Sequence, residues 1–229
     1  MIHSLSDPLS GTPRGRTREK TPVGILISGR GSNMRALVDA CEAADYPASV
    51  RLILSNDPAA PGLAWAAEQG LPTAVIDHRA FASRAAFETT LTARLMAAGV
   101  EFICLAGFMR LLTAGFVQMW RDRLLNIHPS LLPAYKGLNT HARALAAGER
   151  EHGCSVHFVV PEMDAGPIIG QASVPVLPDD TPETLAERVL TQEHKLYPAC
   201  LAAVLAGHRT LEAARAAGAP HTAQLGPPG

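Results

Sequence analysis

Short apolar segments alternate with amphipathic ones from residue 22 to residue 127 of this 229-residue chain. Strands that alternate with helices form βαβ units, which build a mostly parallel sheet with right-handed crossovers. We therefore predict an α/β fold, with a Rossmann-like twisted sheet and helices on both faces. The predicted strands are 23–28, 50–55, 73–76, 102–106 and 124–127, and the predicted helices are 32–44, 62–69, 81–98 and a short one that starts at Thr113.

The last third of the chain departs from this alternation. Residues 154–160 and 168–176 are predicted strands, joined by a short loop that contains Asp164 and Gly166. A connection this short favours antiparallel pairing, because parallel strands need a long crossover. We therefore predict an antiparallel C-terminal addition beside the 124–127 strand.

A long helix is predicted to follow. Thr181 before Pro182 is a typical helix start, with the threonine as N-cap and the proline at the first helical position. The helix runs toward Gly207, and Pro198 is predicted to kink or split it, because proline lacks the N–H that a helix interior uses. The predicted organisation is one domain at 22–208, a disordered N-terminal tail at 1–21 and a loose C-terminal extension at 209–229.

Composition narrows the class of protein. A formal net charge of −1 gives no reason to expect nucleic-acid binding, which depends on many basic contacts to phosphates. No apolar run approaches the roughly 18 residues of a membrane span, and the N-terminus lacks the apolar core of a secretory signal. The four cysteines are widely spaced in apolar segments, which favours reduced thiols. These features predict a cytoplasmic protein without membrane or nucleic-acid partners.

The segment 124–133 (Leu-Leu-Asn-Ile-His-Pro-Ser-Leu-Leu-Pro) carries the most distinctive chemistry. Side chains alternate along a strand, so Asn126 and His128 project from the same face, while Pro129 ends the ladder and keeps His128 extended. Open α/β sheets bind ligands at the carboxyl ends of their strands. An amide donor beside a titratable base at that place suits an acyl-type transfer. A purely structural histidine is the alternative interpretation.

Residues 28–33 (Ser-Gly-Arg-Gly-Ser-Asn) form a turn between the first strand and the first helix. Small residues there let a phosphate approach the backbone N–H groups at the positive end of the helix. The dinucleotide fingerprint is not satisfied, because Met34 occupies the last glycine position, which disfavours a nicotinamide or flavin cofactor. The alternative is a structural turn capped by Ser32 or Asn33.

Histidines are the obvious candidates for a metal site, and Cys154 with His157 is the tempting spacing. These two residues differ by an odd number along a strand and so face opposite sides of the sheet. We therefore predict no metal site. Asp164 is either a turn-forming residue or, if it lies near His128, a carboxylate that favours the imidazolium form. The sequence leaves that choice open.

Together these segments resemble the folate-dependent formyltransferases, in particular those that act on glycinamide ribonucleotide. The resemblance covers about residues 22–208. It implies formyl transfer from 10-formyltetrahydrofolate, as co-substrate, to the amine of glycinamide ribonucleotide in purine biosynthesis, by a monomer or homodimer without a metal. The motifs that carry it are 27–33, 105–112 (Leu-Ala-Gly-Phe-Met-Arg-Leu-Leu), 126–133, 152–159 (His-Gly-Cys-Ser-Val-His-Phe-Val), 164–167 (Asp-Ala-Gly-Pro) and 191–194 (Thr-Gln-Glu-His).

The resemblance also implies roles for individual residues. Asn126, His128 and Asp164 match the catalytic trio of the family. The residues implied to hold glycinamide ribonucleotide are Gly31, Ser32 and Asn33 at its phosphate and neighbouring atoms, and Glu193 at its ribose. The residues implied to border the folate are Arg84, Met109, Arg110, Leu111, Leu112 and Val160, together with Asn126 and Asp164.

Two departures from the family pattern concern loops. Asn139 stands where the family more usually has histidine, within a 135–150 loop expected to be mobile. Ala165 replaces a common glycine beside Asp164. Neither residue belongs to the catalytic trio, so these departures concern the conformation of the loops rather than the activity.

Three alternatives share this fold. A 10-formyltetrahydrofolate deformylase usually carries a domain ahead of the catalytic one, for which we expect residues 1–21 to be too short, and tends to have histidine where this chain has Pro129. Methionyl-tRNA formyltransferase normally adds a C-terminal nucleic-acid-binding domain, for which we expect no room. A non-catalytic nucleotide-binding regulator needs none of Asn126, His128 and Asp164, so the presence of all three disfavours it.

Overall fold

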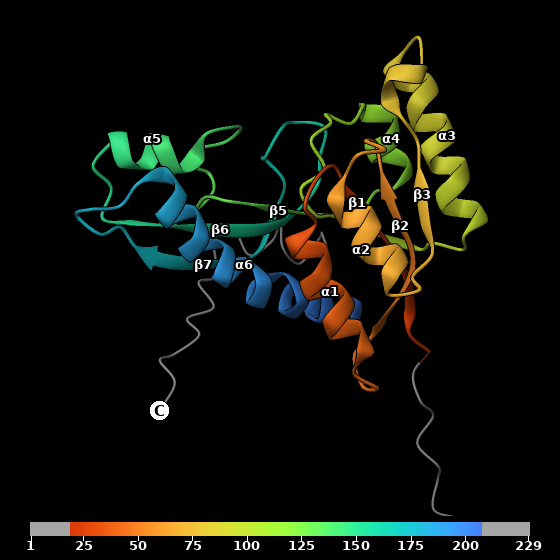
Figure 1. The fold of residues 1–229 in the computed structure, drawn as a ribbon, viewed down its shortest axis with the longest axis horizontal. Helices are drawn as coiled ribbons and strands as arrows, with labels where there is room; N and C mark the ends of the chain where they lie inside the picture. Colours follow the sequence, from red (N-terminus) through yellow and green to blue (C-terminus); the bar gives the residue numbers. More distant parts are fainter. Residues whose placement is uncertain (1–18, 208–229) are drawn as a thin grey trace, which may run out of the picture.

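Seven strands form one sheet in the order β3-β2-β1-β4-β5-β6-β7 in the computed structural model, which describes residues 19–207 (Figure 1). The first five pair in parallel, while β6 is antiparallel to β5 and β7 is antiparallel to β6. The α/β class and the antiparallel addition are therefore confirmed. The strands are β1 (Thr21–Ile27), β2 (Ala48–Ser55), β3 (Thr73–Val75), β4 (Phe102–Leu105), β5 (Leu124–His128), β6 (Glu151–Phe158) and β7 (Ile168–Pro175).

Helices cover both faces of the sheet, as predicted. One core cluster joins the sheet to the first, second and sixth helices, and a second cluster joins the opposite face to the third and fourth. The helices are α1 (Ser32–Glu42), α2 (Pro61–Glu68), α3 (Arg84–Ala97), α4 (Ala114–Met119), α5 (Thr140–Ala146) and α6 (Pro182–Leu205), with a 3₁₀ turn, η1 (His78–Ala80).

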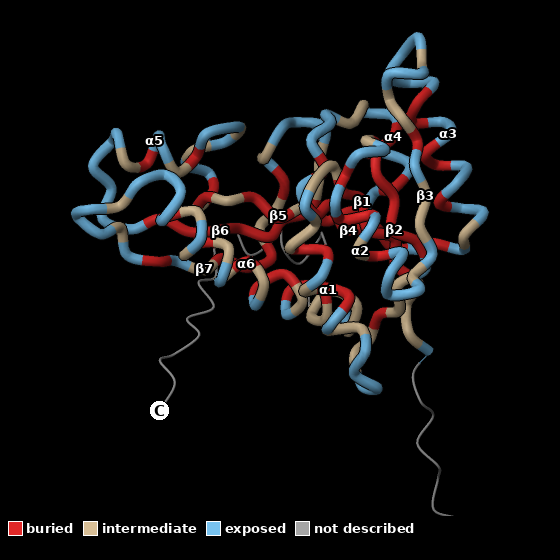
Figure 2. Tube along the Cα trace, viewed as in Figure 1, coloured by how far each residue is buried: buried red, intermediate tan, exposed pale blue. Residues whose placement is uncertain are grey.

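The strand β2 contributes buried side chains to both core clusters. Leu52 and Leu54 are buried in the cluster with α3 and α4, whereas Ile53 is buried in the cluster with α1 and α6. Successive strand residues point to opposite faces, so a run of apolar residues is required where both faces are covered. Figure 2 shows the resulting pattern, with buried strands at the centre and exposed outer surfaces of the helices.

Three sequence predictions need correction. Pro198 does not split the last helix, since α6 is continuous from Pro182 to Leu205. The third helix begins at Arg84 rather than at residue 81, because the Ser83 hydroxyl accepts a hydrogen bond from the N–H of Ala86 and caps it. The segment 135–150, expected as a loop, contains α5, whose alanine-rich sequence favours a helix.

The two ends of the chain lie beyond the described residues. The predicted tails, 1–21 and 209–229, fall outside residues 19–207 except for residues 19–21, of which Thr21 already belongs to β1. Within the described range, no helix has the length and hydropathy that a membrane crossing requires. All four cysteines lie in this range, and no disulfide joins them there.

The strand order also fixes where a ligand can bind. The chain runs outward from β1 to β2 and β3 and then returns to β4 on the other side of β1. A crevice forms at such a reversal, beyond the carboxyl ends of the two central strands, because the following segments leave in opposite directions. The turn after β1 and the loop after β4 meet there, where the N–H of Ser28 donates to the carbonyl of Gly107 over 3.1 Å.

Candidate functional site

Asn126 and His128 lie at the carboxyl end of β5. Asn126 is level with Leu105 of β4 on one side and with His157 of β6 on the other, and His128 is level with Ser155. The strand ends at His128, before Pro129. The sequence predicted this placement, since period-two alternation puts both polar side chains on one face.

Both ring nitrogens of His128 face acceptors. Nε2 lies 3.0 Å from the carbonyl oxygen of Tyr135, and Nδ1 lies 3.5 Å from Oδ2 of Asp164. The imidazole is buried, with 6% of the residue exposed. Each ring nitrogen of His128 therefore has an oxygen atom of another residue within 3.5 Å.

Asp164 is held in place by its loop between β6 and β7. Its backbone is in the left-handed region, with φ 49°, and its Oδ2 accepts a hydrogen bond from the N–H of Gly137 over 2.9 Å. Gly166 lies so close to β6 that a Cβ there would collide with the carbonyl of Phe158. The close approach of this loop therefore brings Asp164 to the end of β5, which settles the choice that the sequence left open in favour of proximity to His128.

A fourth residue, His157 of β6, lies beside Asn126. Its Nε2 is 3.2 Å from Nδ2 of Asn126 and 3.8 Å from Oδ1 of Asp164. Its neighbour Cys154 is in the core on the opposite face of β6, as alternation predicts. The sequence pointed to His157 only as a metal ligand to be rejected; its pairing with Asn126 follows from the register of β5 and β6.

The glycine-rich turn leads into α1 without a side-chain cap. Gly31 is the N-cap with φ 71°, a left-handed conformation suited to glycine, and among residues 19–207 there is no side-chain cap for this helix. The cap by Ser32 or Asn33 that belonged to the alternative interpretation of this turn is therefore wrong. The physical reason is that Ser32 and Asn33 are already the first two residues of the helix, so the N-cap position is occupied by Gly31, which has no side chain. The first backbone N–H groups of α1 lack a side-chain acceptor, which suits an anion.

Glu193 of α6 is a buried carboxyl beside this turn. Its Oε2 accepts the hydrogen bond from Asn33 over 2.6 Å, a contact between residues 160 positions apart. Burial raises the pKa of Glu193, and the hydrogen bond from Asn33 lowers it in part. Oδ1 of Asn33 is buried without a hydrogen-bond partner in the described part of the chain. This pair offers hydrogen-bonding atoms to a polar ligand at the start of α1.

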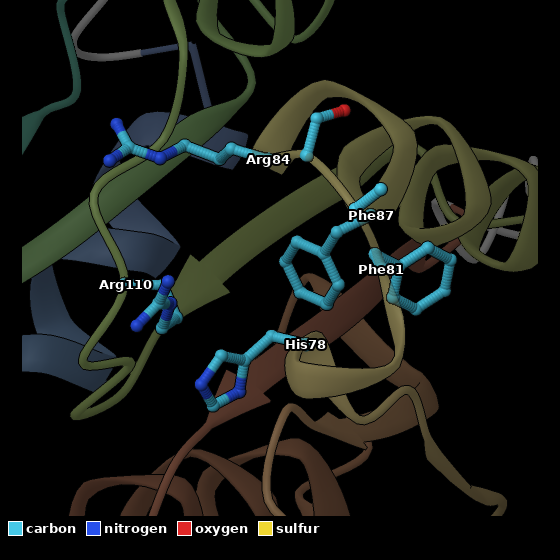
Figure 3. A pocket seen from close by; sticks show the side chains of 7 residues that line it. His78, Phe81, Arg84, Phe87 and Arg110 are labelled. Carbon is cyan, nitrogen blue, oxygen red and sulfur yellow. The ribbon is translucent and has the colours of Figure 1, made fainter.

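A pocket of about 160 Å³ lies between the start of α3 and the loop after β4. Arg84 and Arg110, predicted to border the folate, both line it, together with His78, Phe81 and Phe87 (Figure 3). Two guanidinium groups and an imidazole beside aromatic rings suit a ligand that combines negative charge with an apolar part. The sequence did not single out His78, which comes from η1 and is brought here by the fold.

The remaining predicted folate residues lie on the neighbouring loops. Met109 and Leu111 are 63% and 58% exposed, so both side chains are accessible to a ligand. Leu112 and Val160 are partly buried. The structure thus forms three groups from the predicted residues: Asn126 with His128 and Asp164, the α1 turn with Glu193, and Arg84 with Arg110.

A pair of histidines lies close to this centre. His141 of α5 and His152 of β6 make an edge-to-face contact, with ring centroids 5.1 Å apart. Burial lowers the pKa of His141 to about 4, and His152 and His128 add to the effect. Burial also lowers the pKa of His152. Nδ1 of His141 and Nε2 of His152 have no hydrogen-bond partner within residues 19–207, so both rings are neutral in the folded protein near pH 7.

We expect acid to destabilise the fold through His141. Between pH 6.5 and about 4 the unfolded chain binds a proton at this residue that the folded chain excludes, so the free energy of unfolding falls as the pH falls. The drop in Tm from about pH 7 to about pH 5 is expected to be smaller in His141→Gln than in the wild type. Parallel curves for the two proteins would contradict this assignment.

Comparisons with known proteins agree with this geometry. The family model of formyl transferases matches residues 22–201. The phosphoribosylglycinamide formyltransferase of Escherichia coli K12 is 47% identical over 174 residues, covering 76% of this chain and 82% of that protein. The solved structure of phosphoribosylglycinamide formyltransferase from Coxiella burnetii has 47% identity and a TM-score of 0.80, and the match covers 84% of this chain and 90% of that one.

A longer relative shares the same region. The trifunctional purine biosynthetic protein adenosine-3 of Drosophila melanogaster is 47% identical over 209 residues. The match covers 90% of this chain but 15% of that protein, so the chain spans a small part of the length of such relatives.

Proposed function

The chain belongs to the formyl transferase family, and from this premise we propose that it transfers the formyl group of 10-formyltetrahydrofolate to the amine of glycinamide ribonucleotide. The products are formylglycinamide ribonucleotide and tetrahydrofolate, in purine biosynthesis. The convergence of Asn126, His128 and Asp164 at the end of β5 carries the proposal. The 47% identity to the Escherichia coli enzyme supports the choice of substrates. We place the reaction in the cytoplasm, with small molecules as the partners.

The first chemical step needs a donor for a developing negative charge. The neutral amine of glycinamide ribonucleotide attacks the formyl carbon, a C–N bond forms, and the carbonyl electrons move to oxygen in a tetrahedral intermediate. Nδ2 of Asn126 has two N–H groups, and His157 faces only one side of the amide. The other N–H donates to the oxyanion, an interaction worth about 3 to 4 kcal/mol in comparable sites.

The second step needs a proton donor. The electrons of the oxyanion reform the C=O bond as the C–N bond to the folate nitrogen breaks. That nitrogen gains a proton from His128, and the attacking amine loses one to water, through which His128 is protonated again. His128 supplies positive charge beside the oxyanion and delivers the proton, and Asp164 stabilises its imidazolium form across 3.5 Å. Nε2 of His128 donates to the Tyr135 carbonyl in this structure, and in the proposed reaction the substrate takes the place of that carbonyl.

The two substrates meet at this centre from opposite sides. The N–H groups of Gly31, Ser32 and Asn33 receive the phosphate of glycinamide ribonucleotide at the start of α1, and Glu193 accepts a hydrogen bond from its ribose. The folate lies along the loop after β4, bordered by the pocket of Arg84 and Arg110. The formyl carbon is then held between them at Asn126.

A direct assay tests this function. Purified protein is incubated with 10-formyltetrahydrofolate, with and without glycinamide ribonucleotide, and both products are measured. We expect formylglycinamide ribonucleotide, with tetrahydrofolate formed in equal amount and only when the amine is present. Release of formate without the amine would instead indicate a deformylase, and no turnover would indicate a nucleotide-binding regulator.

The role given to Glu193 predicts a selective loss of nucleotide binding. Glu193→Gln keeps an oxygen that can accept from Asn33 but removes the charge that strengthens a hydrogen bond to the ribose. Because hydrogen bonds to charged groups contribute about 1.5 to 3 kcal/mol, we expect the KM for glycinamide ribonucleotide to rise roughly 10- to 100-fold. The KM for the folate, measured in the same series, is the internal control. Equal changes in both values would contradict the assignment.

A further inference from the structure

The contact between Asn126 and His157 has a defined direction. Nδ1 of His157 lies 3.0 Å from the carbonyl oxygen of Phe158. A backbone carbonyl can only accept, so Nδ1 carries the proton and donates. In a neutral ring the other nitrogen, Nε2, then has only a lone pair. Nδ2 of Asn126, 3.2 Å away, must therefore be the donor to Nε2.

His157 is held in its neutral form by its surroundings. It is 2% exposed, and this burial lowers its pKa. The charged or titratable groups that face it are Asp164, His128 and Lys136; the carboxylate opposes the effect of burial and the other two reinforce it. The net direction is downward, so Nε2 stays an acceptor near neutral pH.

This acceptor fixes which way the Asn126 amide points. In the flipped amide, Oδ1 of Asn126 would face the lone pair of Nε2 of His157. Two acceptors without a shared proton repel each other, and a polar group left unpaired inside the protein costs about 1 to 3 kcal/mol. The orientation with Nδ2 toward His157 is therefore the stable one, and it is the orientation in which Asn126 is a donor.

We infer that His157 is a positioning residue, which locks the Asn126 amide in the orientation that donates an N–H to the reacting formyl oxygen. The inference rests on the proposed function for its kinetic consequence, whereas the hydrogen-bond direction follows from the contacts and burial of His157 and does not depend on that function. His157 makes no contact with substrate in this account and acts through Asn126. The effect belongs to kcat, because the oxyanion exists only in the transition state.

A double-mutant cycle separates positioning from general damage. His157→Leu removes the acceptor, and we expect it to lower kcat by about 10- to 100-fold, with both KM values within about threefold of the wild type. In an Asn126→Ala background the same change should alter kcat by less than about threefold, because the residue on which it acts is gone. His157→Gln is the matched control, since its Oε1 can accept near the position of Nε2, and should recover most of kcat.

Two kinetic results would overturn the inference. One is an equal loss of kcat on His157→Leu in both backgrounds, which indicates damage unrelated to Asn126. The other is a wild-type kcat in His157→Leu. An inactive wild type would reject the proposed function itself, so the two failures are distinct.

A spectroscopic measurement needs no variant and no turnover. Nitrogen-15 NMR of the wild-type protein distinguishes protonated from unprotonated imidazole nitrogens. Near pH 7 we expect Nδ1 of His157 to be protonated and Nε2 to be unprotonated. A protonated Nε2 would overturn the inference, because it would turn the amide of Asn126 around.

Discussion

His128→Ala is expected to lower kcat for formyl transfer by about 10²- to 10⁴-fold. In the proposed mechanism the imidazole supplies both a positive charge and a proton, and in the structure each of its nitrogens has an oxygen atom within 3.5 Å. Alanine leaves the oxyanion with the Asn126 donor alone, and the departing folate nitrogen without its proton source. The measurement is kcat at saturating concentrations of both substrates.

The control for His128→Ala is a measurement that shows whether the variant is still folded. The circular dichroism spectrum and Tm should stay close to those of the wild type, because β5 is held by its neighbours β4 and β6 rather than by this ring. Asp164→Asn should also lower turnover by orders of magnitude, since its amide cannot stabilise the imidazolium as a carboxylate does. Near-normal turnover in either variant would remove that residue from the mechanism.

Asn126→Ala is expected to lower kcat by about 10²- to 10³-fold, the cost of removing one donor from an oxyanion site. The KM values should change little, because this hydrogen bond strengthens only as charge develops on the formyl oxygen. Asn126→Asp is the matched variant: it has nearly the same shape, but a carboxylate cannot donate, so its kcat should fall at least as far. A kcat for Asn126→Asp near that of the wild type would exclude the donor role.

The parts of the fold and site predicted from sequence were those fixed by local periodicity. The apolar runs of β2 and β4 predict buried strands, and the alternation along β5 puts Asn126 and His128 on one face. The antiparallel strands followed from the short connection between them. Each of these depends on residues only a few positions apart, so the sequence alone contains the information.

The parts that sequence did not predict depend on contacts between distant segments. Asp164 reaches His128 only because the loop before β7 packs against β6 at Gly166. Asn33 donates to Glu193, 160 positions away, instead of capping α1. His157 meets Asn126 through strand register. Pro198 lies in an unbroken helix, where the surrounding packing outweighs a local preference.

The most direct test is a crystal structure with glycinamide ribonucleotide and a 10-formyl folate analogue that cannot release its formyl group. We expect the formyl oxygen to lie roughly 3 Å from Nδ2 of Asn126, with the ring of His128 on the same side and the amine facing the formyl carbon. Asp164 should remain beside His128. A formyl group bound away from Asn126, or a His128 ring turned away from the formyl group, would contradict it.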